Sequence, residues 1–148
     1  GSAVADGIPN LTFTAYGLFE AAVLGGTGRD SIDITSSSSS SGSSTPSSQP
    51  RAISYGIASS SVEGGSEDDT ITISATANGA SSQPVGGGVA YGVADASVSG
   101  GSGDDRISIS ATGVGSGFSS GLDSVGYGLL RAAVSGGTGD DVISIAAT

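Results

Sequence analysis

Acidic side chains gather in four short segments that share one pattern. The segments read GGTGRD, GGSEDD, GGSGDD and GGTGDD and begin at Gly25, Gly64, Gly100 and Gly136. Nine of the 14 acidic residues lie in or beside them, namely Asp30, Glu63, Glu67, Asp68, Asp69, Asp104, Asp105, Asp140 and Asp141. Because glycine allows the backbone to turn tightly, the pattern predicts four acidic turns.

Carboxylates this close together favour a bound cation. If the turns stack, each neighbouring pair repels by roughly 1 kcal/mol in water and about 3 kcal/mol at an effective dielectric constant near 20. The chain has no His and no Cys, which excludes ordinary zinc and copper sites, thiol chemistry and a Ser-His-Asp relay. Oxygen ligands remain, and Ca²⁺ takes about six to eight of them at about 2.3 to 2.6 Å.

The turns belong to a longer repeat. Segments of 20 residues align without gaps from Tyr16, Tyr55, Tyr91 and Tyr127, at spacings of 39, 36 and 36 residues. Each begins with Tyr-Gly, continues through an aliphatic stretch to the acidic turn, and ends in an Ile-x-Ile alternation. Alternation with a period of two is typical of a strand with one buried face, so each unit is predicted to fold as strand, turn, strand.

Such a unit buries its apolar face only by stacking on its copies, which predicts an all-β, parallel β-solenoid (β-roll or β-helix) of about four 36-residue repeats. We expect a lead-in at 1–15, in which Gly1-Ser2 is typical of a cloning remnant, and one repeat domain at 16–148. Its repeats are 16–54, 55–90, 91–126 and 127–148. The polar segments 36–48, 77–88 and 113–124 are predicted to be solvated loops.

Two coil lengths fit this pattern. One coil of 36 residues places the acidic turns on adjacent rungs, about 4.8 Å apart, whereas two coils of 18 residues double that separation. Apolar residues at nine-residue spacing, such as Ile53, Val62 and Ile71, favour the shorter coil. A cation shared between turns favours the longer one.

The four turns resemble the GGxGxDxUx nonapeptide of RTX proteins, the hemolysin-type calcium-binding repeats. The resemblance implies Ca²⁺ held between successive turns by Asp side chains and backbone carbonyls, and type I secretion from a Gram-negative bacterium. The implied Asp ligands are Asp30, Asp69, Asp105 and Asp141. The implied carbonyl ligands are those of turn residues: Gly25, Gly64, Gly100, Gly136, Thr27, Ser66, Ser102 and Thr138.

Two features depart from the family pattern. The nonapeptide occurs once per 36 residues rather than in tandem, and Glu67 stands where the family has Gly, which strains the turn or adds a ligand. Asp68, Asp104 and Asp140 are interpreted as outward and solvated, with ligation as the alternative.

These features predict a non-enzymatic, calcium-stabilised structural or adhesive module of a larger secreted or cell-surface bacterial protein. Its expected partners are calcium ions, neighbouring repeats and copies of itself, which would associate end to end as a filament or surface layer. The alternatives are a calcium-dependent ice-binding or carbohydrate-binding solenoid and a polysaccharide-acting β-helix enzyme. The four tyrosines are expected to form a structural aromatic ladder, with a sugar-stacking platform as the alternative. No catalytic residue is expected, because the acidic residues repeat instead of converging.

Composition limits the other partners. A net charge of −10 disfavours nucleic acids and anionic lipids, and no apolar run approaches the roughly 18 residues of a membrane span. The high Gly and Ser content predicts that the chain is disordered without calcium.

Overall fold

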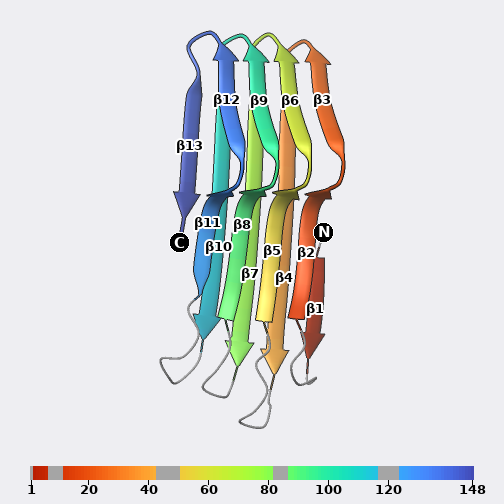
Figure 1. The fold of residues 1–148 in the computed structure, drawn as a ribbon, viewed down its shortest axis with the longest axis vertical. Coiled ribbons are helices and arrows are strands. Elements are labelled where there is room, and N and C mark those ends of the chain that lie inside the picture. Colours follow the sequence, from red (N-terminus) through yellow and green to blue (C-terminus); the bar gives the residue numbers. More distant parts are fainter. Residues whose placement is uncertain (1, 7–11, 43–50, 82–86, 117–123) are drawn as a thin grey trace.

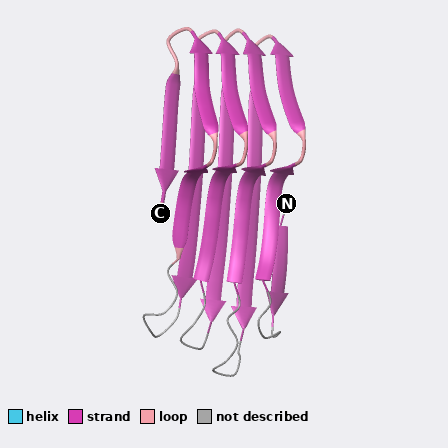
Figure 2. Cartoon of the chain, viewed as in Figure 1, coloured by secondary structure: helices cyan, strands magenta, loops and turns pink. Residues whose placement is uncertain are grey.

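The computed structural model describes residues 2–6, 12–42, 51–81, 87–116 and 124–148, and within them it is all-β with no helix (Figure 2). Parallel sheets form a β-solenoid whose coil is about 36 residues long, which confirms the predicted fold class. The strands are β1 (Ser2–Asp6), β2 (Thr12–Phe19), β3 (Ala22–Thr27), β4 (Ser31–Gly42), β5 (Arg51–Ala58), β6 (Ser61–Ser66), β7 (Thr70–Ser81), β8 (Gly87–Ala94), β9 (Ser97–Ser102), β10 (Arg106–Ser116), β11 (Val125–Leu130), β12 (Ala133–Thr138) and β13 (Val142–Ala147).

Three parallel sheets build the coil. Sheet A has the order β1-β4-β7-β10-β13, sheet B has β11-β8-β5-β2, and sheet C has β12-β9-β6-β3. Each coil runs along sheet B, continues along sheet C and returns behind both along sheet A (Figure 1). The acidic turns join sheet C to sheet A, so all four lie along one edge of the solenoid.

One coil therefore corresponds to one repeat. The four tyrosines that open the repeats lie in register on adjacent strands of sheet B, and their ring centroids are 5.0, 4.8 and 5.1 Å apart. The interpretation of the nine-residue spacing as a shorter coil is wrong. Val62 and Ile71 are both buried, but they lie on different sheets of the same coil, β6 and β7.

The first part of each repeat, predicted as one strand, is divided by a sharp corner between sheets B and C. One residue per rung adopts a left-handed backbone conformation there, with φ of 48°, 49°, 49° and 47°. We call Glu20, Ser59, Asp95 and Arg131 the corner column. The backbone N–H of Glu20 donates to the carbonyl of Ala58 on the next rung, at 3.2 Å, and the next two corners repeat this bond. Because these residues are not glycine, nothing in the sequence marks the corner.

Aliphatic side chains from the facing sheets fill the interior beneath the corner and the turns. The buried cluster consists of Ile34, Ile57, Val62, Ile71, Ile73, Val93, Val98, Ile107 and Ile109. The glycine of the Tyr-Gly pair is required for this packing, since a Cβ at Gly56 would stand 2.5 Å from Cγ2 of Ile73. A thin coil of small and medium side chains thus has a continuous core.

The prediction of solvated loops is wrong over much of the connectors, because β4, β7 and β10 extend to Gly42, Ser81 and Ser116. Ser36 and Ser38 pair in register with Ala75 and Ala77 of β7 and are as buried as those alanines. The interior at this end is narrow and lined by alanine, so a small serine fits where a large side chain would not. Ser36 Oγ lies 2.5 Å from Ser54 Oγ, a hydrogen bond across the interior. The stretches 43–48, 82–86 and 117–123 of these predicted loops lie outside the described residues, and Gly87 and Gly88 belong to β8.

The described part of the expected lead-in belongs to the sheets. Strand β1 pairs with the 37–41 stretch of β4, and β2 begins at Thr12. Across the described ranges no helix is long and apolar enough to cross a membrane.

Candidate functional site

Glycines with positive φ shape the four acidic turns. On the third rung Gly101 and Gly103 have φ of 117° and 129°, and the other rungs have glycine at the same places except at Glu67. Glu67 has φ of 77° and an exposed side chain. A residue with a Cβ is strained in this region of φ, as the sequence suggested for this turn.

We expect Glu67→Gly to raise the free energy of unfolding by about 0.5 to 1 kcal/mol. Relief of the strained φ, about 1 to 2 kcal/mol, exceeds the entropy that glycine adds to the unfolded chain, about 0.4 to 1 kcal/mol. Denaturant unfolding would measure the gain. Glu67→Ala serves as the control because it removes the same charge and keeps the Cβ, and an equal gain in that variant would attribute the effect to charge.

One aspartate per rung points into the coil at the turn. These four residues, Asp30, Asp69, Asp105 and Asp141, form the inner column. The side chains of Asp69 and Asp105 are only 2% exposed. From the second rung onwards, the Oδ1 of the inner aspartate accepts a hydrogen bond from the backbone N–H of the inner aspartate on the preceding rung, at 2.8, 2.8 and 3.0 Å along the column. The inner carboxylates therefore lie in a row, one rung apart.

The second oxygen of these carboxylates is buried without a hydrogen-bond partner. This holds for Oδ2 of Asp30, Asp69 and Asp105. Each Oδ2 lies against the first glycine of its own turn: a Cβ at Gly64 would stand 2.5 Å from Asp69 Oδ2 and 2.5 Å from the carbonyl oxygen of Gly100 on the next rung. Those two oxygens are thus at most about 5 Å apart. The same crowding recurs at Gly25 and Gly100.

A second column of glycines has the same close backbone contact between rungs but faces a different type of side chain. Gly17, Gly56 and Gly92 also have the carbonyl oxygen of the next rung's glycine close to the position of a Cβ, and there the facing side chain is an isoleucine. The glycine backbone is therefore a common device of the coil. Of these two glycine columns, the one at the turn faces a buried carboxylate, and a buried charge is costly unless it is paired.

The aspartates that precede the inner column face outward. Asp68, Asp104 and Asp140, with Arg29 on the first rung, form the outer column. The backbone N–H groups of Asp104 and Asp140 donate to Oδ1 of the preceding outer aspartate, at 3.1 and 2.9 Å. Arg29 Nη2 lies 2.5 Å from Asp68 Oδ2 in an exposed ion pair. The outer carboxylates are thus on the surface, apart from the inner ones.

The third turn position forms a hydroxyl column of Thr27, Ser66, Ser102 and Thr138, aligned in register on sheet C. The Oγ of Ser66 donates to the carbonyl of Gly26 at 3.4 Å, and the carbonyl of Thr138 accepts the N–H of Gly103 at 2.9 Å. At least the Thr138 carbonyl, a candidate ligand, therefore already has a backbone partner.

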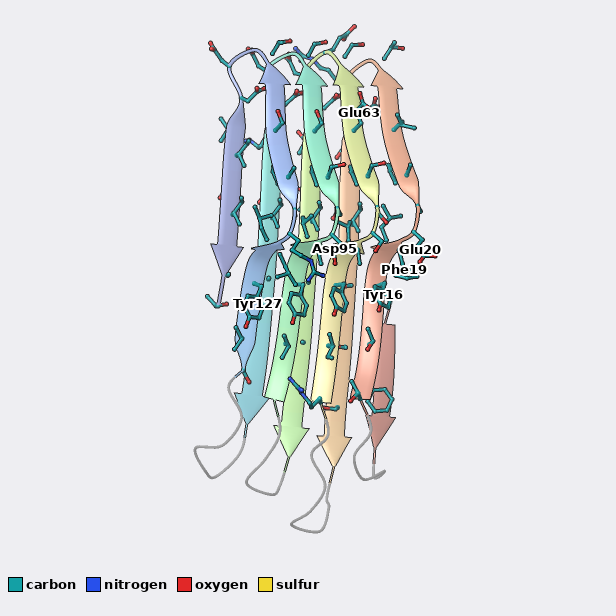
Figure 3. All side chains as sticks on the ribbon, viewed as in Figure 1. Tyr16, Phe19, Glu20, Glu63, Asp95 and Tyr127 are labelled. Carbon is teal, nitrogen blue, oxygen red and sulfur yellow. The ribbon has the colours of Figure 1, made fainter. Side chains whose placement is uncertain are left out.

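The tyrosine column presents ring edges to solvent rather than ring faces. Neighbouring rings are stacked with interplanar angles of 10°, 11° and 9°, and Phe19 packs on Tyr16 at 4.7 Å. Tyr16 and Tyr127 lie at the two ends of the column (Figure 3). Burial, together with the charges of Tyr91, Tyr16 and Asp95, raises the pKa of the Tyr55 hydroxyl. A sugar that stacks on ring faces would find those of Tyr55 and Tyr91 covered.

Arg131 forms an ion pair within the corner column. Arg131 Nε and Nη2 both lie 2.6 Å from the carboxylate oxygens of Asp95 on the preceding rung, and this hydrogen-bonded pair lowers the pKa of Asp95. No sequence signal identified the pair, because the left-handed corner that aligns the two residues is itself unmarked.

The inner column offers oxygen donors but no compact cluster of side chains. Within the described ranges no group of three or more His, Cys, Asp or Glu side chains is placed to hold a metal ion, because each rung contributes one inner carboxylate. A cation at this edge would therefore need backbone carbonyls or water as further ligands. In comparisons with protein-family models, curated proteins and solved structures, no match to this chain was found.

Proposed function

We propose that this chain is a calcium-stabilised structural module whose inner column binds Ca²⁺ between successive rungs. The observation that carries the proposal is the buried, unpartnered Oδ2 on three successive rungs. A buried anion requires a compensating charge, and an oxygen-only donor set suits a hard cation.

The donors would come from two rungs at once. Asp69 Oδ2 and the carbonyl oxygen of Gly100 lie on either side of one rung interface, at most about 5 Å apart. An ion with bonds of about 2.3 to 2.6 Å to oxygen can contact both. The remaining ligands would be turn carbonyls or water, and the exposed outer column adds negative charge without direct contact.

Calcium would thereby control folding. Four rungs have three interfaces, and at a calcium concentration ten times Kd each bound ion adds about 1.4 kcal/mol, or about 4 kcal/mol together. That is comparable with the whole stability of a small domain. Without the ion, the stacked carboxylates repel, which suits a chain that is exported unfolded and folds where calcium is abundant, outside a bacterial cell.

A structural or adhesive role fits the repetition of the site better than catalysis does. Every rung presents one inner aspartate, so the buried carboxylates repeat along the solenoid instead of converging on one site. The proposed place of action is the cell surface or the medium.

Calorimetric titration and circular dichroism would test calcium binding directly. We expect Ca²⁺ to bind the chelator-treated protein and to raise its thermal midpoint, together with an increase in strand signal. Mg²⁺ at the same concentration is the control and should act weakly, since it demands near-octahedral geometry and gives up its water reluctantly. Identical spectra and midpoints in EDTA and in calcium would refute the proposal.

A further inference from the structure

We propose that the two ends of the solenoid are complementary and that a second copy of this chain docks on the first, head to tail. In this arrangement β11, β12 and β13 of one copy pair with β2, β3 and β4 of the second copy and continue all three sheets. The match has three parts: the outline of the strand edges, the charges of two columns, and the register of the exposed apolar side chains.

At each end of sheet A, the outermost strand pairs with only part of its neighbour, and the unpaired parts at the two ends are complementary. At the first rung, β1 pairs with the 37–41 stretch of β4, and on that side no described strand pairs with the 31–36 stretch. At the last rung, β13 pairs with 106–111 of β10 and Thr148 extends the pairing to Gly113, so that among the described residues 114–116 have no partner on this side. In the docked pair, β13 of the first copy lies beside the unpaired 31–36 stretch of β4 in the second copy. In return, β1 of the second copy lies beside the unpaired end of β10 in the first copy. Thr148 of the first copy and Ser2 of the second copy would occupy the same position in this rung, so the backbone of one of them must take a different path.

The corner column carries opposite charges at its two ends. Arg131 occupies the corner on the last rung, where it already pairs with Asp95 of the preceding rung at 2.6 Å. Glu20 occupies the corner on the first rung, at the edge of the molecule (Figure 3). Docking places Glu20 of the second copy one rung beyond Arg131, the same separation that Asp95 has on the other side.

The outer column repeats this complementarity with the signs exchanged. Asp140 is its last member and Arg29 its first, and within the chain Arg29 already pairs with Asp68 one rung away. Docking brings Arg29 of the second copy one rung from Asp140. The charges therefore select the head-to-tail orientation.

The hydrogen-bond ladder and the apolar residues continue across the same junction. The N–H of Asp105 donates to Asp141 Oδ1, and the N–H of Asp141 would donate to Asp30 Oδ1 of the second copy. Tyr127, Ile143 and Ile145 are 43%, 42% and 45% exposed on the last rung. Docking in register covers them with Tyr16, Ile32 and Ile34 of the second copy. Because such an interface does not close on itself, repeated docking yields a filament.

Sedimentation velocity of the 148-residue chain, in calcium and in chelator, tests the docking, with circular dichroism confirming that each sample is folded. The mass should rise with concentration for the unaltered chain. Glu20→Arg should lower the association constant by about fivefold or more, because it replaces an ion pair with a like-charge contact. Glu63→Arg is the matched control: it makes the same charge change at an exposed position on β6, an inner strand of sheet C (Figure 3), and should leave association unchanged.

A mixing experiment identifies the junction. Arg131→Glu should also impair self-association, whereas an equimolar mixture of Glu20→Arg and Arg131→Glu should assemble. In the mixture the introduced carboxylate at position 131 faces the introduced guanidinium at position 20. A folded chain that stays monomeric at all concentrations would overturn the proposal. So would equal weakening by Glu63→Arg, or a mixture of folded variants that stays monomeric.

Discussion

Asp105→Asn is expected to change stability in opposite directions with and without calcium. In saturating calcium the variant should be less stable than the unaltered chain, because an amide is a poorer ligand and carries no charge to balance the ion. Loss of one ion at a calcium concentration about 1,000 times Kd removes about 4 kcal/mol, which exceeds the roughly 1 to 3 kcal/mol that the variant gains from weaker repulsion between carboxylates, so a net deficit remains. Thermal or denaturant unfolding in calcium measures it.

In chelator the same variant should be more stable, by on the order of 1 to 3 kcal/mol. Asp105 lies between Asp69 and Asp141, one rung from each, and a pair of charges about 5 Å apart repels by about 3 kcal/mol at an effective dielectric constant near 20. Asn keeps the oxygen that accepts the backbone N–H of Asp69. Its amide group can donate to the carbonyl of Gly136, which lies close to the present Oδ2.

Asp104→Asn is the matched control, since it makes the same substitution at the adjacent, exposed residue of the outer column. We expect it to change stability little in either condition. A loss of stability in Asp105→Asn that is equal with and without calcium would show that the residue is structural only. A calcium effect in Asp104→Asn as large as that in Asp105→Asn would indicate that calcium binds at the exposed outer column instead.

The second large effect is expected from Gly100→Ala. A Cβ at this position would overlap both the carboxylate of Asp105 and the carbonyl oxygen of Gly136 on the next rung. A carbonyl within a sheet cannot move cheaply, so we expect a loss of about 3 kcal/mol in the free energy of unfolding, at the upper end of overpacking costs. Calcium should no longer stabilise the third interface, because the added methyl group lies where the two donors converge.

Ser99→Ala, at the preceding half-buried residue, gives the baseline for an alanine in β9 and should fall within about 0.5 kcal/mol of the unaltered chain. The double variant Gly100→Ala with Asp105→Ala separates the two contacts. If overlap with the Asp105 carboxylate causes most of the loss, the double variant should be more stable than Gly100→Ala alone. Gly100→Ala with the stability of Ser99→Ala would contradict the packing described for this turn.

Much of the fold could be predicted because its determinants are local. Ile107 and Ile109 alternate with serine, which identifies a strand with one buried face, and the glycines before Asp105 identify the turn. Repetition of both at a near-constant spacing then indicates stacking, since one unit has too little apolar surface to fold alone. The inner aspartates were placed in one column by this periodicity.

Other features depend on contacts between residues far apart in sequence. Ser36 and Ser38 lie in a low-complexity tract typical of a loop, yet they continue a strand because β7 offers an in-register partner and the narrow interior accepts only small side chains. The corner at Asp95 is formed by a non-glycine residue with φ of 49°. The backbone bond from Asp95 to Leu130 on the next rung, at 3.0 Å, helps to hold it.

The sequence by itself determined the repeat, the strand faces and the position of an acidic turn in every unit, because these follow from the alternation and spacing of neighbouring residues. Only the tertiary structure decided that one repeat makes one coil, and that Oδ2 of Asp30, Asp69 and Asp105 is buried against glycine without a partner. Burial and hydrogen bonding are set by the neighbouring rungs, which stand 36 or 39 residues away along the chain. The chemistry proposed for this edge depends on that stacking.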